Sequence, residues 1–160
     1  MKLIVPVENL NDYIGKDIGH SDWFLIDQDR INKFAAVTID HQFIHVDEEQ
    51  AKNGPFGATI AHGFLTLSML TYLTESCGLI PENSVMGINY GFDKVRFLMP
   101  LKVNNRIRAR VKPISATERN PGQWLMKSEV TVDIENEEKP ALVCEWLALV
   151  FTKEGLFFGI

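Results

Sequence analysis

The sequence predicts an α+β fold in which an antiparallel sheet wraps around one long central helix. Residues 53–74 contain no Asp, Glu, Lys or Arg, and an apolar helix is expected from about Thr59 to Ser76. After Pro81 four consecutive segments have the pattern of β-strands: apolar residues alternate with polar ones in the first three, and the last is apolar almost throughout. Strands that follow a helix without alternating with further helices favour α+β. This order of elements is that of a hot-dog fold.

The expected central helix has apolar residues on nearly every side, which is typical of a helix buried in a protein or a membrane. A membrane span needs about 20 predominantly apolar residues. Gly54, Pro55 and Gly57 break the first third of the uncharged stretch, and His62 interrupts the rest. We therefore expect burial under the sheet and no membrane insertion. The apolar residues are Ile60, Phe64, Leu65, Leu67, Met69, Leu70, Tyr72 and Leu73.

The second half of the chain supplies the strands. In the first of them the apolar phase changes near Asp93–Lys94, which predicts a bulge. The sequence Asn120-Pro121-Gly122 predicts a turn before the third strand. The last strand is apolar on both faces apart from Glu145, so we expect both of its faces to be covered. The four segments are Val85–Phe97, Arg106–Pro113, Gln123–Asp133 and Ala141–Phe151.

The first half is less regular but carries two helix-start signals. Asp27 is placed to cap a helix that buries Ile31, Phe34 and Ala35 and ends before Asp40. Asp47 and Gln50 have the spacing of a capping box for a short turn over 47–52.

Composition is that of a globular protein, with 46% hydrophobic and 23% charged residues in 160. This length predicts one domain over residues 1–160. The net charge of -5 argues against nucleic acid or an anionic membrane as partner. Cys77 and Cys144 form no CxxC pair, and the first residues lack the apolar run of an export signal. A cytoplasmic protein is expected.

Two short motifs resemble the MaoC-like dehydratase family, whose best-known members are the (R)-specific enoyl-CoA hydratases. They are the stretch from Asp40 to His45 and the His62-Gly63 pair that opens the central helix. The chain also resembles the nodulation-protein-N-like subgroup. Gln42-Phe43 stands where many hydratases have Asn-Pro, which bears on the turn and on acyl-chain preference. The subgroup features are Asp22-Trp23, Gly54-Pro55-Phe56-Gly57 and Ile88-Asn89-Tyr90-Gly91.

The resemblance implies that Asp40 and His45 are the acid–base pair, holding the water that adds to an enoyl thioester. Residues five apart do not converge on one helix, so we expect both on a tight loop. The residues leave open which of the two takes the proton from water. They also leave open the alternative that Asp40 caps a local turn and His45 is a surface residue.

Gly63 is the third expected catalytic position. An amide in the first turn of a helix has no intrahelical acceptor, and glycine lets a carbonyl come close. The resemblance implies that this amide is the oxyanion donor; simple helix–strand packing is the alternative. His62 is expected to be structural, with its ring tied to neighbouring backbone.

Further residues are candidates for contacts with the substrate. The expected substrate-binding residues are Gln42, Phe56, Asn89 and Arg96. The alternating Arg106, Arg108 and Arg110 would either meet the phosphates of coenzyme A or form a solvated face. The side chains expected to line an acyl tunnel, or else to be ordinary core, are Phe56, Phe64, Met69, Tyr72 and Met86.

No metal and no cofactor beyond the coenzyme A of the substrate is expected. His41 and His45, with Asp40 and His62, do not show a recognisable metal-ligand spacing. Exposed sheet edges and the resemblance predict a homodimer. The expected activity is hydration of trans-2-enoyl-CoA to (R)-3-hydroxyacyl-CoA. A non-catalytic acyl-thioester-binding module and an acyl-CoA thioesterase using Asp40 are the alternatives.

Overall fold

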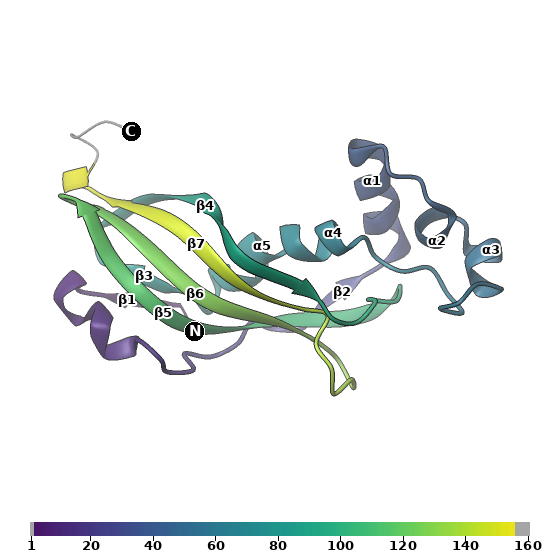
Figure 1. Cartoon of the computed structure of the whole chain (residues 1–160), viewed down its shortest axis with the longest axis horizontal. Helices are drawn as coiled ribbons and strands as arrows, with labels where there is room; N and C mark the ends of the chain where they lie inside the picture. Colours follow the sequence, from purple (N-terminus) through teal and green to yellow (C-terminus); the bar gives the residue numbers. More distant parts are fainter. Residues whose placement is uncertain (1, 156–160) are drawn as a thin grey trace.

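A computed structural model describes residues 2–155 and shows a curled five-stranded antiparallel sheet with a helix packed against it. The strand order is β2-β5-β6-β7-β4. The predicted α+β hot-dog fold is confirmed (Figure 1). The strands of this sheet are β2 (Phe24–Ile26), β4 (Ser84–Phe97), β5 (Asn105–Asn120), β6 (Gln123–Ile134) and β7 (Leu142–Thr152).

The four predicted strands are present as β4 to β7. The predicted bulge is confirmed, since the register of β4 against β7 shifts between Phe92 and Lys94. The predicted turn is also present, with Gly122 at φ 70° between β5 and β6. Strand β5 is longer than expected, because it pairs with β6 all the way from Ile107 to Asn120.

The central helix is shorter than predicted. It comprises α4 (Gly63–Ser68) and α5 (Leu70–Glu75), with Met69 between them still in a right-handed helical conformation. The preceding residues pair as extended chain, since the Ala61 amide donates to the Leu101 carbonyl at 2.7 Å. Ile60 also forms a bridge with Lys102. These contacts hold 59–62 out of the helix and leave Gly63 as its first residue.

The central helix is also less completely buried than predicted. Its buried apolar residues, Leu65, Met69, Leu70 and Leu73, join one core with the concave face of the sheet. The opposite side is open, with Phe64 68% and Tyr72 56% exposed. No helix within residues 2–155 is long and apolar enough to cross a membrane.

Three helices form an overhang beside the start of α4 (Figure 1). The predicted cap of α1 (Gln28–Thr38) is confirmed, because Asp27 accepts from the Arg30 amide at 2.9 Å. Ile31 and Ala35 are fully buried, and Phe34 packs against the core. Helices α2 (Phe43–Val46) and α3 (Glu48–Lys52) follow.

The capping residue predicted for 47–52 is confirmed, since Asp47 accepts from the Gln50 amide at 2.9 Å at the start of α3. The N-terminal elements were not predicted. They are β1 (Leu3–Val5), which pairs in parallel with β3 (Leu79–Pro81), and the 3-10 helix η1 (Val7–Tyr13).

Candidate active site

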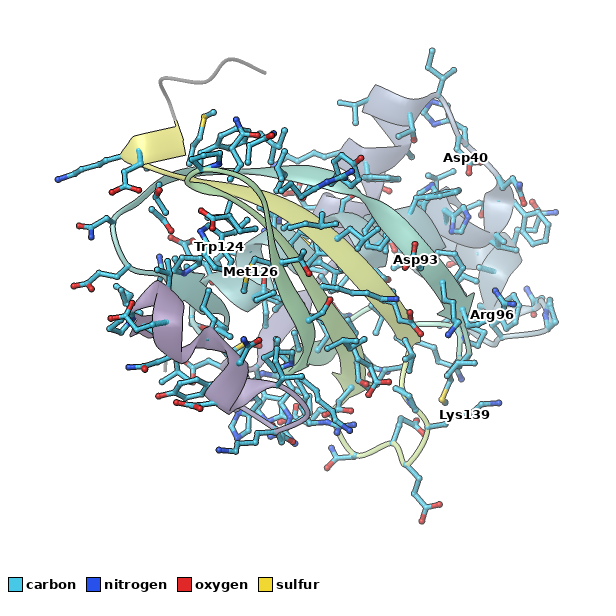
Figure 2. All side chains as sticks on the ribbon, turned by 60° about the vertical axis from the view of Figure 1, so that its left-hand side comes forward. Asp40, Asp93, Arg96, Trp124, Met126 and Lys139 are labelled. Atoms are coloured by element: carbon cyan, nitrogen blue, oxygen red, sulfur yellow. The ribbon has the colours of Figure 1, made fainter. Side chains whose placement is uncertain are left out.

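The loop after α1 carries Asp40. Helix α1 ends at Thr38, and its C-cap Ile39 has a φ of 61° in the left-handed region, which is uncommon for a β-branched residue. This conformation turns the chain away from the helix axis, toward the start of α4. The Asp40 side chain is 43% exposed, and one of its oxygens is 3.4 Å from the Gln42 amide. Asp40 thus has a partly solvated carboxylate at the edge of the overhang (Figure 2).

His45 lies on the short helix α2 and is buried, with 7% exposure. The expectation of a loop position is wrong, and so is the alternative of a surface residue. Two bonds fix its place: its Nδ1 is 2.7 Å from the carbonyl of Ile60, and Gln28 Nε2 donates to its backbone carbonyl at 2.7 Å. The extended segment before α4 therefore orients the His45 ring.

The contact with Ile60 determines the tautomer of His45. A carbonyl oxygen only accepts, so Nδ1 carries the proton in this bond. In the neutral ring Nε2 is then the bare nitrogen, with a lone pair available for a proton.

Burial lowers the pKa of His45 below its ordinary value, and the neighbouring His62 lowers it further. The bond to the Ile60 carbonyl and the Asp40 carboxylate raise this pKa, but the lowering effects are larger in sum. His45 is therefore neutral at pH 7, with the proton arrangement that a general base needs.

His62 links the two predicted catalytic residues. It precedes α4, is 3% exposed, and its Nε2 donates to the backbone carbonyl of Asp40 at 3.0 Å. Its ring stacks on that of His45, with centroids 3.7 Å apart and planes 24° apart. The prediction that backbone holds this ring is confirmed. One side-chain oxygen or nitrogen from each of Asp40, His45 and His62 lies within 4.8 Å of the others.

Gly63 and His45 line the same cavity of about 220 Å³. The walls come from the end of β4 and the loop that follows it, 97–101. A Cβ on Gly63 would lie 3.1 Å from the Phe97 ring. This close approach agrees with the packing alternative, while the shared cavity agrees with a donor role. Gly63 therefore packs closely against Phe97 and also lines the cavity that His45 borders.

The predicted substrate-binding residues do not converge on this cavity. Gln42 is exposed and caps α2, and Phe56 is half-buried in the loop after α3; neither lines the cavity. Asn89 lines a separate cavity of about 480 Å³ between α5 and the sheet. Arg96 is exposed on β4, next to the cavity residue Phe97, and donates to the Val95 carbonyl at 2.8 Å (Figure 2).

The arginine stripe on β5 is engaged in ion pairs. Arg110 contacts Asp133 at 2.8 Å and Arg108 contacts the same carboxylate at 3.3 Å. Arg106 reaches Glu135 at 3.4 Å. Burial raises the pKa of Asp133, but the bonds and charges of Arg110 and Arg108 together outweigh it and hold this pKa below its usual range. The pairing agrees with a structural surface rather than with free phosphate-binding groups.

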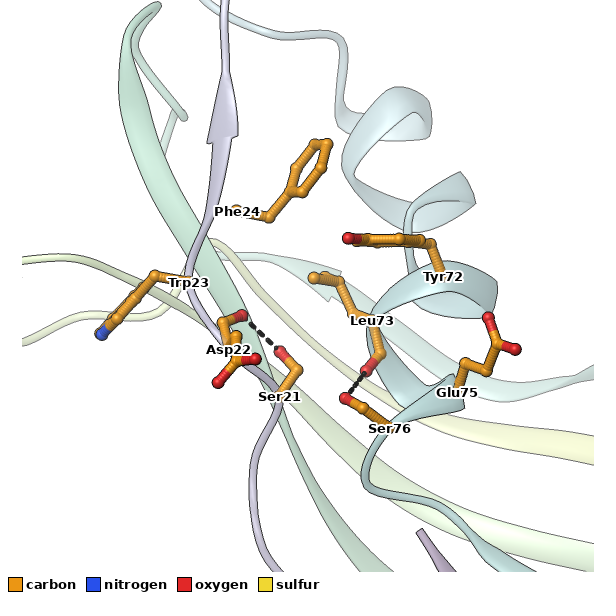
Figure 3. A pocket seen from close by; sticks show the side chains of 8 residues that line it. All are labelled: Ser21, Asp22, Trp23, Phe24, Tyr72, Leu73, Glu75 and Ser76. Carbon is orange, nitrogen blue, oxygen red and sulfur yellow. Dashed lines mark hydrogen bonds between the residues drawn. The ribbon is translucent and has the colours of Figure 1, made fainter. Parts of the chain in front are cut away.

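Another cavity, of about 350 Å³, lies between β2 and α5 (Figure 3). Asp22 and Trp23 belong to its lining, but the Trp23 indole points away from Tyr72 and Leu73 (Figure 3). Trp23 instead stacks under the Arg108 guanidinium, 4.5 Å from the ring centroid. The Asp22-Trp23 motif is thus remote from His45 and Gly63.

Sequence reasoning missed the residues that hold the site in place. Gln28 bridges α1 and α2, and Thr59 Oγ1 donates to Gln28 Oε1 at 2.5 Å. Phe97 faces Gly63 from β4. No sequence signal pointed to Gln28, because it stands 17 residues before His45 and looks like an ordinary first residue of a helix.

A metal ion fits poorly on Asp40, His45 and His62. Metal-binding lone pairs of imidazole lie in the ring plane, so two stacked rings do not aim them at one point. The Nδ1 of His45 and the Nε2 of His62 are also already engaged by backbone carbonyls. His41 is exposed and outside the group.

Comparison with known proteins assigns the family. The MaoC-like domain matches residues 9–137. The chain belongs to the MaoC-like dehydratase family. This membership places it among the hydro-lyases. It is 45% identical to nodulation protein N of Rhizobium leguminosarum bv. viciae, over 86% of each chain. It is 41% identical to the 3-hydroxyacyl-thioester dehydratase Z of Mycobacterium tuberculosis, over 91% of this chain and 95% of that one.

Solved structures agree on the fold of this MaoC-like protein. The (R)-hydratase of A. caviae superposes with a TM-score of 0.67 at 19% identity, covering 83% of this chain and 95% of that one. The monoamine oxidase regulatory protein of Archaeoglobus gives a TM-score of 0.75 at 21% identity, covering 96% and 97%.

Proposed function

We propose that this protein is an (R)-specific enoyl-CoA hydratase, which adds water reversibly to a trans-2-enoyl-CoA to give an (R)-3-hydroxyacyl-CoA. The observation that carries the proposal is the buried, neutral His45, whose Nδ1 is bound to the Ile60 carbonyl and whose ring borders the cavity of Gly63, with one of its ring nitrogens within 4.8 Å of an Asp40 carboxylate oxygen. The dehydratase name of a relative covering most of this chain supports the thioester chemistry.

In the proposed reaction one water lies between Asp40 and His45. It donates one O–H to the Asp40 carboxylate and the other to Nε2 of His45. As the water oxygen bonds to C3, its proton passes to Nε2 and the electron pair of the double bond moves toward the thioester oxygen. The proton on Nε2 then goes to C2 on the same face, which gives syn addition. Each acid–base contribution of this kind is worth about 10²–10⁴-fold.

The Gly63 amide is proposed to stabilise the enolate. Negative charge grows on the thioester oxygen when water attacks C3, and this amide is the first of the helix, with no intrahelical acceptor. The N-terminal end of the helix also carries partial positive charge. A donor of this kind contributes about 3–4 kcal/mol to transition-state stabilisation.

Coenzyme A is the proposed carrier, and Arg96 the residue proposed to meet its phosphates. The Arg96 guanidinium is exposed directly beside Phe97, at the wall of the cavity. Gln42, Phe56 and Asn89, which do not line the cavity of His45, are proposed to contact parts of the thioester outside that cavity.

We propose a homodimer formed through β4. Among the described strands, β4 pairs with β7 on one side only, and an unpaired edge invites pairing with another chain. Large apolar side chains are exposed along and just beyond it, which a second copy would cover. They are Val85, Met86, Ile88, Tyr90, Phe92, Phe97 and Leu98.

The activity is tested with enoyl-CoA thioesters of short, medium and long acyl chains. Hydration removes the ultraviolet absorbance of the conjugated enoyl group, whereas hydrolysis releases a thiol. Loss of absorbance without thiol release supports the hydratase. Thiol release instead would indicate a thioesterase. A higher melting temperature with neither reaction would indicate a non-catalytic binding module.

A further inference from the structure

His62 makes contacts that its place as a helix cap does not require. Helix α4 starts without a side-chain cap, so the His62 ring satisfies none of the orphan amides of the first turn. Instead the ring reaches back to the overhang. It lies between Phe34 of α1, with centroids 5.1 Å apart, and His45 of α2, with centroids 3.7 Å apart.

The hydrogen bonding of His62 is incomplete. Nε2 donates to the Asp40 carbonyl, which leaves Nδ1 as the second ring nitrogen in need of a partner. That Nδ1 is buried and has no hydrogen-bond partner among residues 2–155. A buried unpaired polar atom is costly, and an apolar ring of similar shape would avoid that cost. Stability alone therefore does not account for a histidine here.

We propose that His62 is a positioning residue that holds Asp40 and His45 in register with each other, an inference that rests on the proposed hydratase function. Its Nε2–H fixes the backbone of Asp40, while its ring face fixes the plane of the His45 ring. A single rigid side chain thus sets both ends of the space in which the water is held.

The two contacts can be separated by substitution. His62→Phe keeps a flat ring against His45 but removes the donor to the Asp40 carbonyl. His62→Gln places an amide donor near the same carbonyl but removes the stacked ring. His20→Phe and His20→Gln are matched controls. His20 is exposed, and its backbone forms an isolated β-bridge with Arg110 on the distant strand β5.

The expected results differ between the two variants. In His62→Phe the Asp40 backbone loses its anchor, so kcat falls at least about tenfold with KM little changed. The phenyl ring still covers His45, so the acid limb of the pH profile moves less than in His62→Gln, by only the charge effect that His62 exerted. In His62→Gln the His45 ring becomes more solvated, and the acid limb moves to higher pH. The titratable groups acting on His45 are His62 from the cap of α4 and Asp40 from the loop after α1. The wall from β4 contributes Phe97 and other uncharged residues.

A second measurement keeps this inference separate from the proposed function. NMR titration of the His45 ring protons, in wild type and in both variants, needs no substrate. If wild type proves inactive on thioesters, a larger rise of the His45 pKa in His62→Gln than in His62→Phe still supports the positioning role. An unchanged His45 titration in both variants would overturn it.

If wild type is active, the kinetics of the two His62 variants test the positioning role. Wild-type kcat and acid limb in both His62 variants would overturn the inference and leave the hydratase proposal standing. A lower melting temperature in both variants, with kcat per folded molecule and the acid limb unchanged, would also overturn it, because His62 would then be structural only.

Discussion

At the scale of single residues, Asp40 and His45 differ in environment although they stand five positions apart. The His45 ring is buried and has one nitrogen bound to a carbonyl, whereas the Asp40 carboxylate is partly exposed. This difference favours His45 as the base, a choice that the sequence left open. The pairing of the two residues was predictable from the motif. The burial of His45 was not, because it comes from Ile60 and His62, which are 15 and 17 residues further along the chain.

The pH dependence of activity follows from the pKa of His45. A general base must be unprotonated, and burial lowers this pKa from its ordinary value of about 6.5. We expect the acid limb of kcat/KM to lie below pH 6.5, as measured from initial rates of enoyl-CoA hydration. An acid limb clearly above 6.5 would contradict the assignment. In the unfolded chain His45 has its ordinary, higher pKa and binds a proton more readily than in the folded protein. The free energy of unfolding should therefore fall as the pH drops below about 6.5.

Removal of the His45 side chain should affect stability as well as activity. His45→Ala leaves the buried Ile60 carbonyl without its donor, and an unmet buried group costs about 1–3 kcal/mol. Urea unfolding followed by tryptophan fluorescence measures the loss. The exposed His41→Ala is the control, with an expected change below about 0.5 kcal/mol. Equal stabilities of the two variants would mean that the bond to Ile60 contributes nothing.

At the scale of elements, the position at which the central helix starts determines whether the Gly63 amide is free to donate to a substrate. A helix from Thr59 would put the Gly63 amide inside the hydrogen-bonded ladder, where it has an acceptor of its own. The structure ends the extended segment at 62 because that segment pairs with 101–103. This pairing joins residues about 40 positions apart, so local periodicity did not reveal it. The 3.6-residue pattern alone extended the helix too far.

Substitution of Gly63 tests its role at the helix start. In Gly63→Ala the new Cβ would lie 3.1 Å from the Phe97 ring and beside the amide. We expect turnover of enoyl-CoA to fall at least about tenfold. Adding Phe97→Leu relieves the contact with the ring, so the double variant should regain stability without regaining turnover. Recovery of full turnover in the double variant would show that Gly63 serves packing alone.

At the scale of the whole molecule, the four long strands were predicted from the sequence, but their order in the sheet and the sheet edges were not. Alternating apolar residues predicted β4, β5 and β6, and a short continuous apolar segment predicted β7. Strands β1, β2 and β3 have three residues each, which is too short for an alternating pattern to be recognised in the sequence. Strand β2 nevertheless forms one edge of the sheet, which leaves β4 as the other.

The proposed dimer is tested at the β4 edge. In Ile88→Lys each copy would bring a charge into the proposed interface, so we expect sedimentation to show a shift from dimer toward monomer at micromolar concentration. The control is Val37→Lys, which adds the same charge to another exposed apolar position, on α1. A stable wild-type monomer at that concentration would contradict the dimer.

The central claim is that Asp40 and His45 together activate one water for addition to an enoyl thioester. The most direct measurement compares the rate of crotonyl-CoA hydration by wild type and by Asp40→Asn, followed by ultraviolet absorbance at matched concentrations of folded protein. Asp40→Asn preserves size and should leave the melting temperature near wild type, because this side chain is partly exposed. The account predicts a decrease in turnover of at least about 10²-fold. Full activity of Asp40→Asn would contradict it.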